Sequence, residues 1–209
     1  MRQVGYGKGM KIVAIENRSI MFVGVGGQGS LLASKLMGHV LLAEGYDVKV
    51  SEVHGMSQRG GSVVTYVKYG EKVYSPTVEI GEADLIIAFE LLEAARYVPY
   101  LKEGATIIVN AQRIDPMPVI TGAATYPTEI TKKIHEKGIH IAEVDALGLA
   151  LKAGNAKAVN VVLMGVLSNY MNISKDLWLT AIQECVPERF RELNLTAFEI
   201  GKNTKMTVQ

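Results

Sequence analysis

The chain has 209 residues, 48% of them hydrophobic, and its 22 basic and 21 acidic side chains leave a formal net charge of +1. This charge balance excludes the strongly basic face of a nucleic-acid-binding protein, and the apolar content excludes a chain that is disordered throughout. The single cysteine, Cys185, excludes an internal disulfide and an iron–sulfur cluster held by this chain, and no uncharged run is long enough to span a membrane, so we expect a single-domain cytoplasmic protein.

The first third of the chain has the order of a strand–helix–strand unit. In chain order it predicts a loose lead-in over 1–18, a strand over 19–25, a glycine-rich loop over 24–29, a helix over 30–44 and a strand over 47–52. The first strand is nearly all apolar, which is typical of a strand covered on both faces, and Gly45 ends the helix. This order predicts a βαβ unit with a right-handed crossover in a parallel sheet. We take 19–209 as one domain, because no linker or repeat divides it.

The middle third predicts that the sheet is mixed. Two β-prone runs, 62–69 and 72–74, are separated by Gly70 and Glu71 and predict a hairpin. Further strands are predicted over 83–89, 105–110 and 139–144, with a helix over 91–98 and an irregular segment over 113–127.

The last third changes to helices, which are predicted over 145–152, 156–171, 175–186 and 187–201. The second of them is apolar nearly all round, so we expect it to lie under the others. The last one has a predicted apolar seam at Phe190, Leu193, Ala197 and Ile200. We expect Cys185 to be buried or half-buried and Trp178 to lie in the core or an interface. Lys35 and His39 are expected on a solvated face of the first helix.

The glycine-rich loop is the first candidate for a binding site. Its candidate residues are Gly24, Gly26, Gly27, Gln28 and Gly29, which match G-x-G-x-x-G between a strand and a helix. Glycines allow a tight turn there, and backbone N–H groups at the start of a helix attract anions. Glu52 ends the next strand, about where a ribose-binding acid occurs in dinucleotide-binding proteins. The pattern leaves two interpretations open, a dinucleotide site or close packing of the helix on the sheet.

A second polar cluster follows the second strand, and we expect it at the same edge of the sheet. It contains His54, Ser57, Gln58, Arg59, Gly60 and Gly61. Ligands and partners bind at this edge in open α/β sheets, so the cluster predicts a ligand or subunit contact, with a solvated loop as the alternative. A hydrolase with His54 as base and Ser57 as nucleophile is disfavoured, because no G-x-S-x-G turn is present. No set of His, Asp and Glu residues has the spacing of a metal site.

Together the two clusters resemble a known family. Gly-Val-Gly-Gly-Gln-Gly over 24–29 and Val-His-Gly-Met-Ser-Gln-Arg-Gly-Gly over 53–61 are similar to the gamma-type domain of 2-oxoacid:ferredoxin oxidoreductases, as is the segment 154–165. The resemblance extends from about residue 20 to about residue 201. The second motif most resembles the small (beta) subunits of the members that act on indolepyruvate. A gamma subunit for pyruvate, 2-oxoglutarate or branched-chain 2-oxoacids is the alternative within the family.

The resemblance implies a three-layer α/β/α fold with a mostly parallel, mixed sheet and a helical C-terminal third. It also implies a reaction, in which an aryl 2-oxoacid, coenzyme A and oxidised ferredoxin give arylacetyl-coenzyme A, carbon dioxide and reduced ferredoxin. Thiamine diphosphate and iron–sulfur clusters are then expected on a large partner subunit, so this chain is expected to bind no cofactor and to be inactive alone. Because the family uses no nicotinamide, the resemblance disfavours the dinucleotide interpretation, which stays as that of a stand-alone binding protein.

Arg59 is the charged residue of the second cluster, and the adjacent Gly60 and Gly61 let the backbone approach a ligand closely. A guanidinium is a planar five-donor fork that suits carboxylates and phosphates. With the amides of the glycine-rich loop, we expect Arg59 to hold the phosphates of coenzyme A or an acidic group of the partner subunit. The alternative is an ion pair inside the chain with Glu52 or Glu90.

Overall fold

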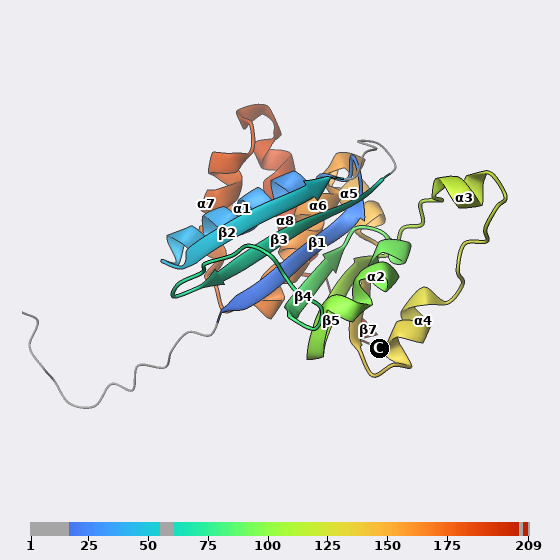
Figure 1. Cartoon of the computed structure of the whole chain (residues 1–209). Coiled ribbons are helices and arrows are strands. Elements are labelled where there is room, and N and C mark those ends of the chain that lie inside the picture. The colour runs from blue at the N-terminus through green and yellow to red at the C-terminus, as the bar shows by residue number, and fades with distance from the viewer. Residues whose placement is uncertain (1–16, 55–60, 205–206, 209) are drawn as a thin grey trace, which may run out of the picture.

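The computed structural model describes residues 17–54, 61–204 and 207–208 (Figure 1). In this part of the chain, seven strands form one mixed sheet in the order β2-β3-β1-β4-β5-β6-β7. The strands are β1 (Arg18–Val25), β2 (Asp47–His54), β3 (Ser62–Gly70), β4 (Ala83–Ala88), β5 (Leu101–Asn110), β6 (His140–Val144) and β7 (Thr207–Val208). The helices are α1 (Ser30–Ala43), α2 (Leu91–Tyr97), α3 (Met117–Ile120), α4 (Ile130–His135), α5 (Ala146–Ala153), α6 (Val159–Leu167), α7 (Lys175–Cys185) and α8 (Arg191–Lys202). Single 3-10 turns lie at Val98–Tyr100, Ala156–Ala158, Ser168–Tyr170 and Glu188–Phe190.

Helices cover both faces of the sheet, so the molecule has three layers. On one face α1 and α5 to α8 enclose a large hydrophobic cluster, and on the other α2 and α4 pack over a smaller one (Figure 1). Strand β1 belongs to both clusters, because Ile20 and Phe22 point to one face while Met21 and Val23 point to the other. The predicted α/β/α fold, the first strand covered on both faces and the helical C-terminal third are therefore confirmed.

The predicted βαβ unit is wrong in its strand pairing. Strands β1 and β2 are not neighbours, because β3 lies between them and pairs antiparallel with both. Val64 and Val67 of β3 are buried, whereas Val50 and Val53 of β2 are 47% and 49% exposed at the edge of the sheet. The more apolar strand therefore takes the inner position, and α1 leads to the edge strand.

The predicted hairpin between 62–69 and 72–74 is also wrong, although the mixed sheet is confirmed. Strand β3 pairs with β2 along its whole length, and 72–74 forms no strand. Instead Asp47, at the start of β2, holds this segment by accepting the N–H of Val73 at 3.0 Å. A run of three residues cannot compete with the eight paired positions that β2 offers.

The other half of the sheet agrees with the predicted strands. Strands β1, β4, β5 and β6 are parallel neighbours, and β5 begins earlier than predicted, at Leu101. The sequence analysis does not predict β7, nor α3 inside the irregular segment, nor α4. Helix α4 could have been predicted from the spacing of Ile130 and Ile134, which lie about one helical turn apart and are both buried.

The last third confirms the buried helix and corrects the apolar seam of its neighbour. Every residue of α6 is buried. On α8 the buried residues are Asn194, Ala197, Phe198 and Gly201, whereas Phe190 of the predicted seam is 40% exposed. Close packing explains this difference, since a Cβ at Gly201 would lie 2.0 Å from the carbonyl oxygen of Val162 in α6. Only a face that carries glycine lets α8 approach α6 so closely.

Four single-residue expectations have mixed outcomes. Trp178 lies in the core, 1% exposed, with its ring stacked on that of Phe198, and Cys185 is half-buried as predicted. Lys35 is exposed as predicted. The prediction of a solvated His39 is confirmed in part, because its side chain is 33% exposed and its Nε2 lies 3.0 Å from an oxygen of Glu184 on α7. That contact depends on α7 packing beside α1, which no local pattern indicates.

Candidate functional site

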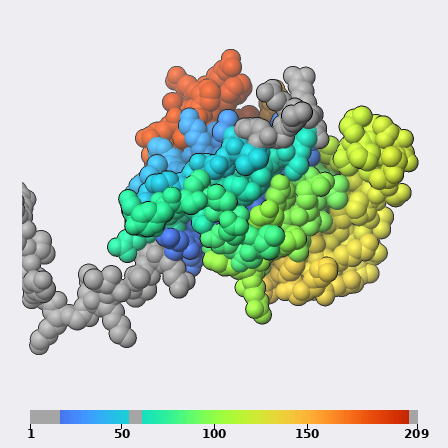
Figure 2. All heavy atoms as spheres, in the orientation of Figure 1, coloured from blue at the N-terminus to red at the C-terminus, as the bar shows by residue number. Residues whose placement is uncertain are grey.

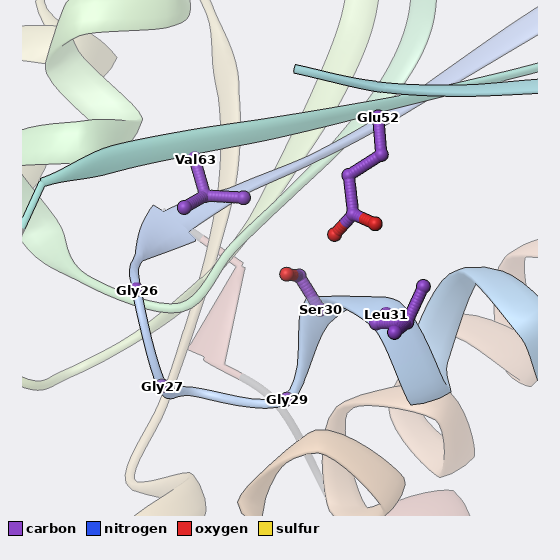
Figure 3. Close-up of a pocket in the computed structure, with 7 residues that line it drawn as sticks. All are labelled: Gly26, Gly27, Gly29, Ser30, Leu31, Glu52 and Val63. Carbon is purple, nitrogen blue, oxygen red and sulfur yellow. The ribbon is translucent and has the colours of Figure 1, made fainter. Parts of the chain in front are cut away.

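The glycine-rich loop joins the carboxyl end of β1 to the start of α1 (Figure 3). Gly27 and Gly29 have φ angles of 101° and 82°, in the left-handed region that glycine adopts without strain. The N–H of Gly26 donates to the carbonyl of Gly61 at 2.9 Å. This bond joins the loop to Gly61, the last residue of the second polar cluster, and shows that this end of the cluster lies at the same edge of the sheet as the loop.

The side chain of Gln28 is directed into the protein, where it braces the loop. Its Oε1 accepts the N–H of Val25 at 2.7 Å, and its Nε2 donates to the carbonyl of Phe89 at 3.0 Å. Nε2 also lies 3.4 Å from Oε1 of Gln112. The amide of Gln28 thus joins the ends of β1 and β4 and positions the backbone of the loop.

A buried asparagine extends this network to the next strand. Asn110 ends β5, and its Nδ2 donates to the carbonyl of Phe89 at 3.1 Å and to Oε1 of Gln112 at 3.0 Å. Its Oδ1 accepts the N–H of Ala146, at the start of α5, at 3.1 Å. Because these polar groups satisfy one another, the ends of three parallel strands form a fixed platform under the loop.

Two of the glycines are required by packing. A Cβ at Gly24 would lie 3.0 Å from Cβ of Phe89, and one at Gly29 would lie 2.5 Å from Nδ2 of Asn160 on α6. That Nδ2 donates to the carbonyl of Gly29 at 3.2 Å. Gly27 is different, since it is exposed and a Cβ there would meet no atom within 4 Å. The packing interpretation therefore holds for Gly24 and Gly29, and Gly27 lies open to an incoming ligand.

Two hollows flank the loop. The first, of about 550 Å³, lies between the loop, the start of α1 and the strands β2 and β3. Figure 3 shows the Glu52 carboxylate and the Ser30 hydroxyl pointing toward each other in it. The second, of about 540 Å³, lies on the other side of Gly27 and includes Gln112, Lys157 and Asn160. Glu52 was predicted to lie near the loop, and both line the first hollow.

The charges around the loop distinguish the two hollows. Helix α1 has no acidic residue in its first turn, and in the described part of the chain no side chain caps its N-terminus. Its first amides therefore present partial positive charge to both hollows. Glu52 lines the first hollow, whereas Lys157, which is exposed, lines the second. The second hollow therefore combines the amides next to Gly27 with a basic residue.

The second polar cluster is described only at its two ends. The backbone of His54 ends β2 and pairs with Val63, and Gly61 bonds to Gly26. Ser57, Gln58, Arg59 and Gly60 lie outside the described residues. The candidate site is therefore built from the glycine-rich loop, the two hollows and the network below them.

Four further residues come together at this site that were not predicted from the sequence: Asn110, Gln112, Lys157 and Asn160. Two of these residues stand out in the sequence because their neighbours are apolar. Asn110 directly follows the apolar run of β5, and Asn160 lies within the apolar helix α6, and both are buried. A polar residue inside an apolar run has a specific partner when it is buried, but the run does not indicate which one.

A family model described as pyruvate ferredoxin/flavodoxin oxidoreductase matches residues 19–204. The chain belongs to this family. The resemblance inferred from the two glycine-containing motifs is thereby confirmed.

Within the residues that the structure describes, no group of three or more His, Cys, Asp or Glu side chains could hold a metal ion. None of the described helices is long and apolar enough to cross a bilayer.

Members of the pyruvate ferredoxin/flavodoxin oxidoreductase family differ in how similar they are to this chain. The chain is 46% identical to the indolepyruvate oxidoreductase subunit IorB of Thermococcus kodakarensis, over 88% of this chain and 93% of the relative. It is 26% identical to the common subunit gamma of the pyruvate/ketoisovalerate oxidoreductases of the same organism, over 82% of this chain and 85% of the relative.

A solved structure shares the fold. It is the 2-oxoglutarate:ferredoxin oxidoreductase of Magnetococcus marinus, with 2-oxoglutarate, coenzyme A and succinyl-coenzyme A bound. The TM-score is 0.69 at 20% identity, and the match covers 89% of this chain and 30% of the larger one. The fold of this chain therefore corresponds to one part of a longer polypeptide in that enzyme.

Proposed function

We propose that this chain is the small subunit of an indolepyruvate:ferredoxin oxidoreductase. The complex would convert an aryl 2-oxoacid, coenzyme A and oxidised ferredoxin into arylacetyl-coenzyme A, carbon dioxide and reduced ferredoxin. The observation that carries this proposal is the contrast in identity, 46% to an indolepyruvate oxidoreductase subunit against 26% to a pyruvate/ketoisovalerate subunit.

The proposal places the redox chemistry on a larger partner subunit. An iron–sulfur cluster takes cysteine thiolates as ligands, and this chain has one cysteine, so its residues do not fit a cluster. Thiamine diphosphate and the iron–sulfur clusters then belong to the partner, ferredoxin acts through the complex, and the chain alone is inactive. We place the complex in the cytoplasm, where coenzyme A and ferredoxin are available.

The role of this chain is to complete a binding surface. Coenzyme A carries phosphates, and the amides next to Gly27 together with Lys157 present positive charge. We propose that the second hollow holds the phosphates of coenzyme A or an acidic group of the partner subunit. His54, which ends β2, is proposed to contribute contacts there as well, and so is the segment 57–61 that follows it in the sequence.

Co-expression with the large subunit tests the proposal. The purified complex should reduce ferredoxin with indolepyruvate and coenzyme A, with a kcat/KM well above that for pyruvate or 2-oxoglutarate, and each subunit alone should give no turnover. A complex that prefers pyruvate would assign the chain to the other branch of the family.

A titration addresses the remaining alternative, a stand-alone dinucleotide-binding protein. The isolated chain is titrated with NAD, FAD and coenzyme A. Tight binding of NAD or FAD without any partner subunit would contradict the proposed function.

A further inference from the structure

A segment of the chain projects from the carboxyl edge of the sheet, and its Val119 packs against the hydrophobic cluster that α2 and α4 cover. Residues 116–125, here called the arm, follow β5 and contain α3 (Figure 1). In Figure 2 the same residues form a yellow-green lobe beside the body of the molecule. Met117 and Ile120, on α3, are each 65% exposed. From Pro116 to Thr128 the sequence has no charged side chain.

Several backbone groups of the arm bond to one another. The N–H groups of Val119 and Ile120 donate to the carbonyl of Pro116, and that of Ala124 donates to the carbonyl of Pro118, at 2.9 to 3.1 Å. The hydroxyl of Thr121 donates to the carbonyl of Met117 at 3.0 Å. Because these groups are already bonded and the side chains are uncharged, a partner could cover the arm at little desolvation cost.

The base of the arm is held rigidly by Glu90, which is 1% exposed. On one side of the arm its Oε1 accepts the N–H of Ile114 at 3.1 Å, and on the other side the same oxygen accepts the hydroxyl of Tyr126. Burial and the bond to Glu90 raise the pKa of Tyr126, so this hydroxyl stays protonated and is the donor. Arg113 lies 4.4 Å above the ring of Tyr126. A clamp at both ends fixes the arm before binding, which lowers the entropy that binding costs.

The arm lies next to the candidate site. Gln112, just before the arm, bonds to Asn110 of the platform below the glycine-rich loop, and its carbonyl accepts the N–H of Leu91. If the reacting groups are on a partner subunit, the surface around the loop must face that subunit. The arm borders this surface, and its lack of charge with exposed Met and Ile is typical of the centre of a stable interface.

We propose that the arm is a docking element that inserts into an uncharged, apolar groove of the larger subunit of the same oxidoreductase. The identity of the partner rests on the proposed function. The geometry on this chain is independent of it, since the exposed apolar tip, the internal hydrogen bonds and the Glu90 clamp are properties of the arm itself.

The test compares the affinity of arm variants for the purified large subunit. Met117→Glu/Ile120→Glu places two carboxylates in the contact and should weaken binding at least about tenfold. Leu42→Glu/Leu151→Glu is the matched control, because these side chains are 61% and 59% exposed on α1 and α5, away from the arm. The control should bind like the unaltered chain, and circular dichroism should show that both variants are folded.

Hydrogen exchange gives a readout that needs no variant. The amides of 116–125 should exchange more slowly in the complex than in the isolated chain. Affinity unchanged within about twofold in the arm variant, or exchange unchanged on assembly, would overturn the docking role. A chain that dimerises through the arm while the arm variant still binds the large subunit would overturn the choice of partner. An unaltered chain that fails to bind the large subunit contradicts the proposed function instead.

Discussion

At the scale of single residues, the candidate site depends on glycines that have different roles in one loop. Gly29 is needed because Asn160 occupies the space of a Cβ, whereas Gly27 is needed only for its left-handed backbone. The two positions have similar φ angles, so substitutions there separate the cost of the backbone from the cost of packing.

Gly29→Ala should lower the free energy of unfolding by about 2–4 kcal/mol, since it adds overpacking against Asn160 to the cost of a left-handed alanine. Gly27→Ala is the control and should lose only the backbone part, about 1–2 kcal/mol. Urea unfolding of both variants measures the difference. Equal losses would show that Asn160 yields to the added methyl group.

Asp47 predicts a pH dependence of stability. The pKa of its carboxyl is lowered from 3.8 to about 2, first by the hydrogen bond from Lys49 and then by the N–H of Val73. Because the folded pKa lies below the unfolded one, ionised Asp47 stabilises the fold above pH 3.8, and this contribution is lost as the pH falls through about 2. Asp47→Asn should therefore melt below the unaltered chain near neutral pH, and the gap in Tm should close toward pH 2. A gap that does not change with pH would rule out the charge as its cause.

At the scale of elements, helices α6 and α8 pack so closely that each carries a glycine at the contact. A Cβ at Gly201 would lie 2.0 Å from the carbonyl oxygen of Val162, and one at Gly165 would lie 2.1 Å from that of Phe198. These obstacles are backbone atoms, so the helices must separate if either glycine is replaced. The contact anchors α6, which carries Asn160 beneath the glycine-rich loop.

Gly201→Ala should destabilise the fold by about 2–3 kcal/mol, because the added methyl group forces α8 away from α6. The matched variant is Gly38→Ala, in the interior of α1, where the nearest atom to a Cβ is 3.8 Å away on Val50. That change should stabilise the fold by up to about 1 kcal/mol, because alanine favours helix. Thermal unfolding of the two variants should thus shift in opposite directions, and a shared direction would contradict the packing argument.

At the scale of the whole molecule, the carboxyl edge of the sheet gathers the glycine-rich loop, the hollow with Lys157 and the arm. Lys157→Glu should raise the KM for coenzyme A in the assembled complex about threefold to tenfold and leave that for the 2-oxoacid unchanged, since it reverses the charge beside Gly27. Lys152→Glu is the control, because Lys152 is also exposed but lies at the end of α5. If both changes act alike, net charge explains the effect rather than this hollow.

The fold class, the candidate loop and the family could all be predicted from the amino-acid sequence alone. A nearly continuous apolar run such as 19–25 indicates a strand that is buried on both faces. A glycine-rich segment directly after it indicates a tight turn into a helix. The same local reasoning predicts a strand over 72–74 and a parallel pairing of β1 with β2, and both are wrong. Each strand pairs with whichever neighbouring strand gives the more favourable contacts, and the sequence of one strand does not show which other strands are available.

The residues that surround the loop, and the arm that projects beside it, depend on contacts between distant parts of the chain. Asn160 lies 131 positions from Gly29 along the chain, yet its amide bonds to that glycine. Glu90 bonds on both sides of the arm, and the sequence around Glu90 shows neither contact. Period and propensity report on neighbours within a few residues, whereas a buried polar side chain finds its partner only when distant elements pack. The glycine-rich loop could therefore be predicted from the sequence. The buried side chains that support the loop and the arm beside it depend on how distant elements pack.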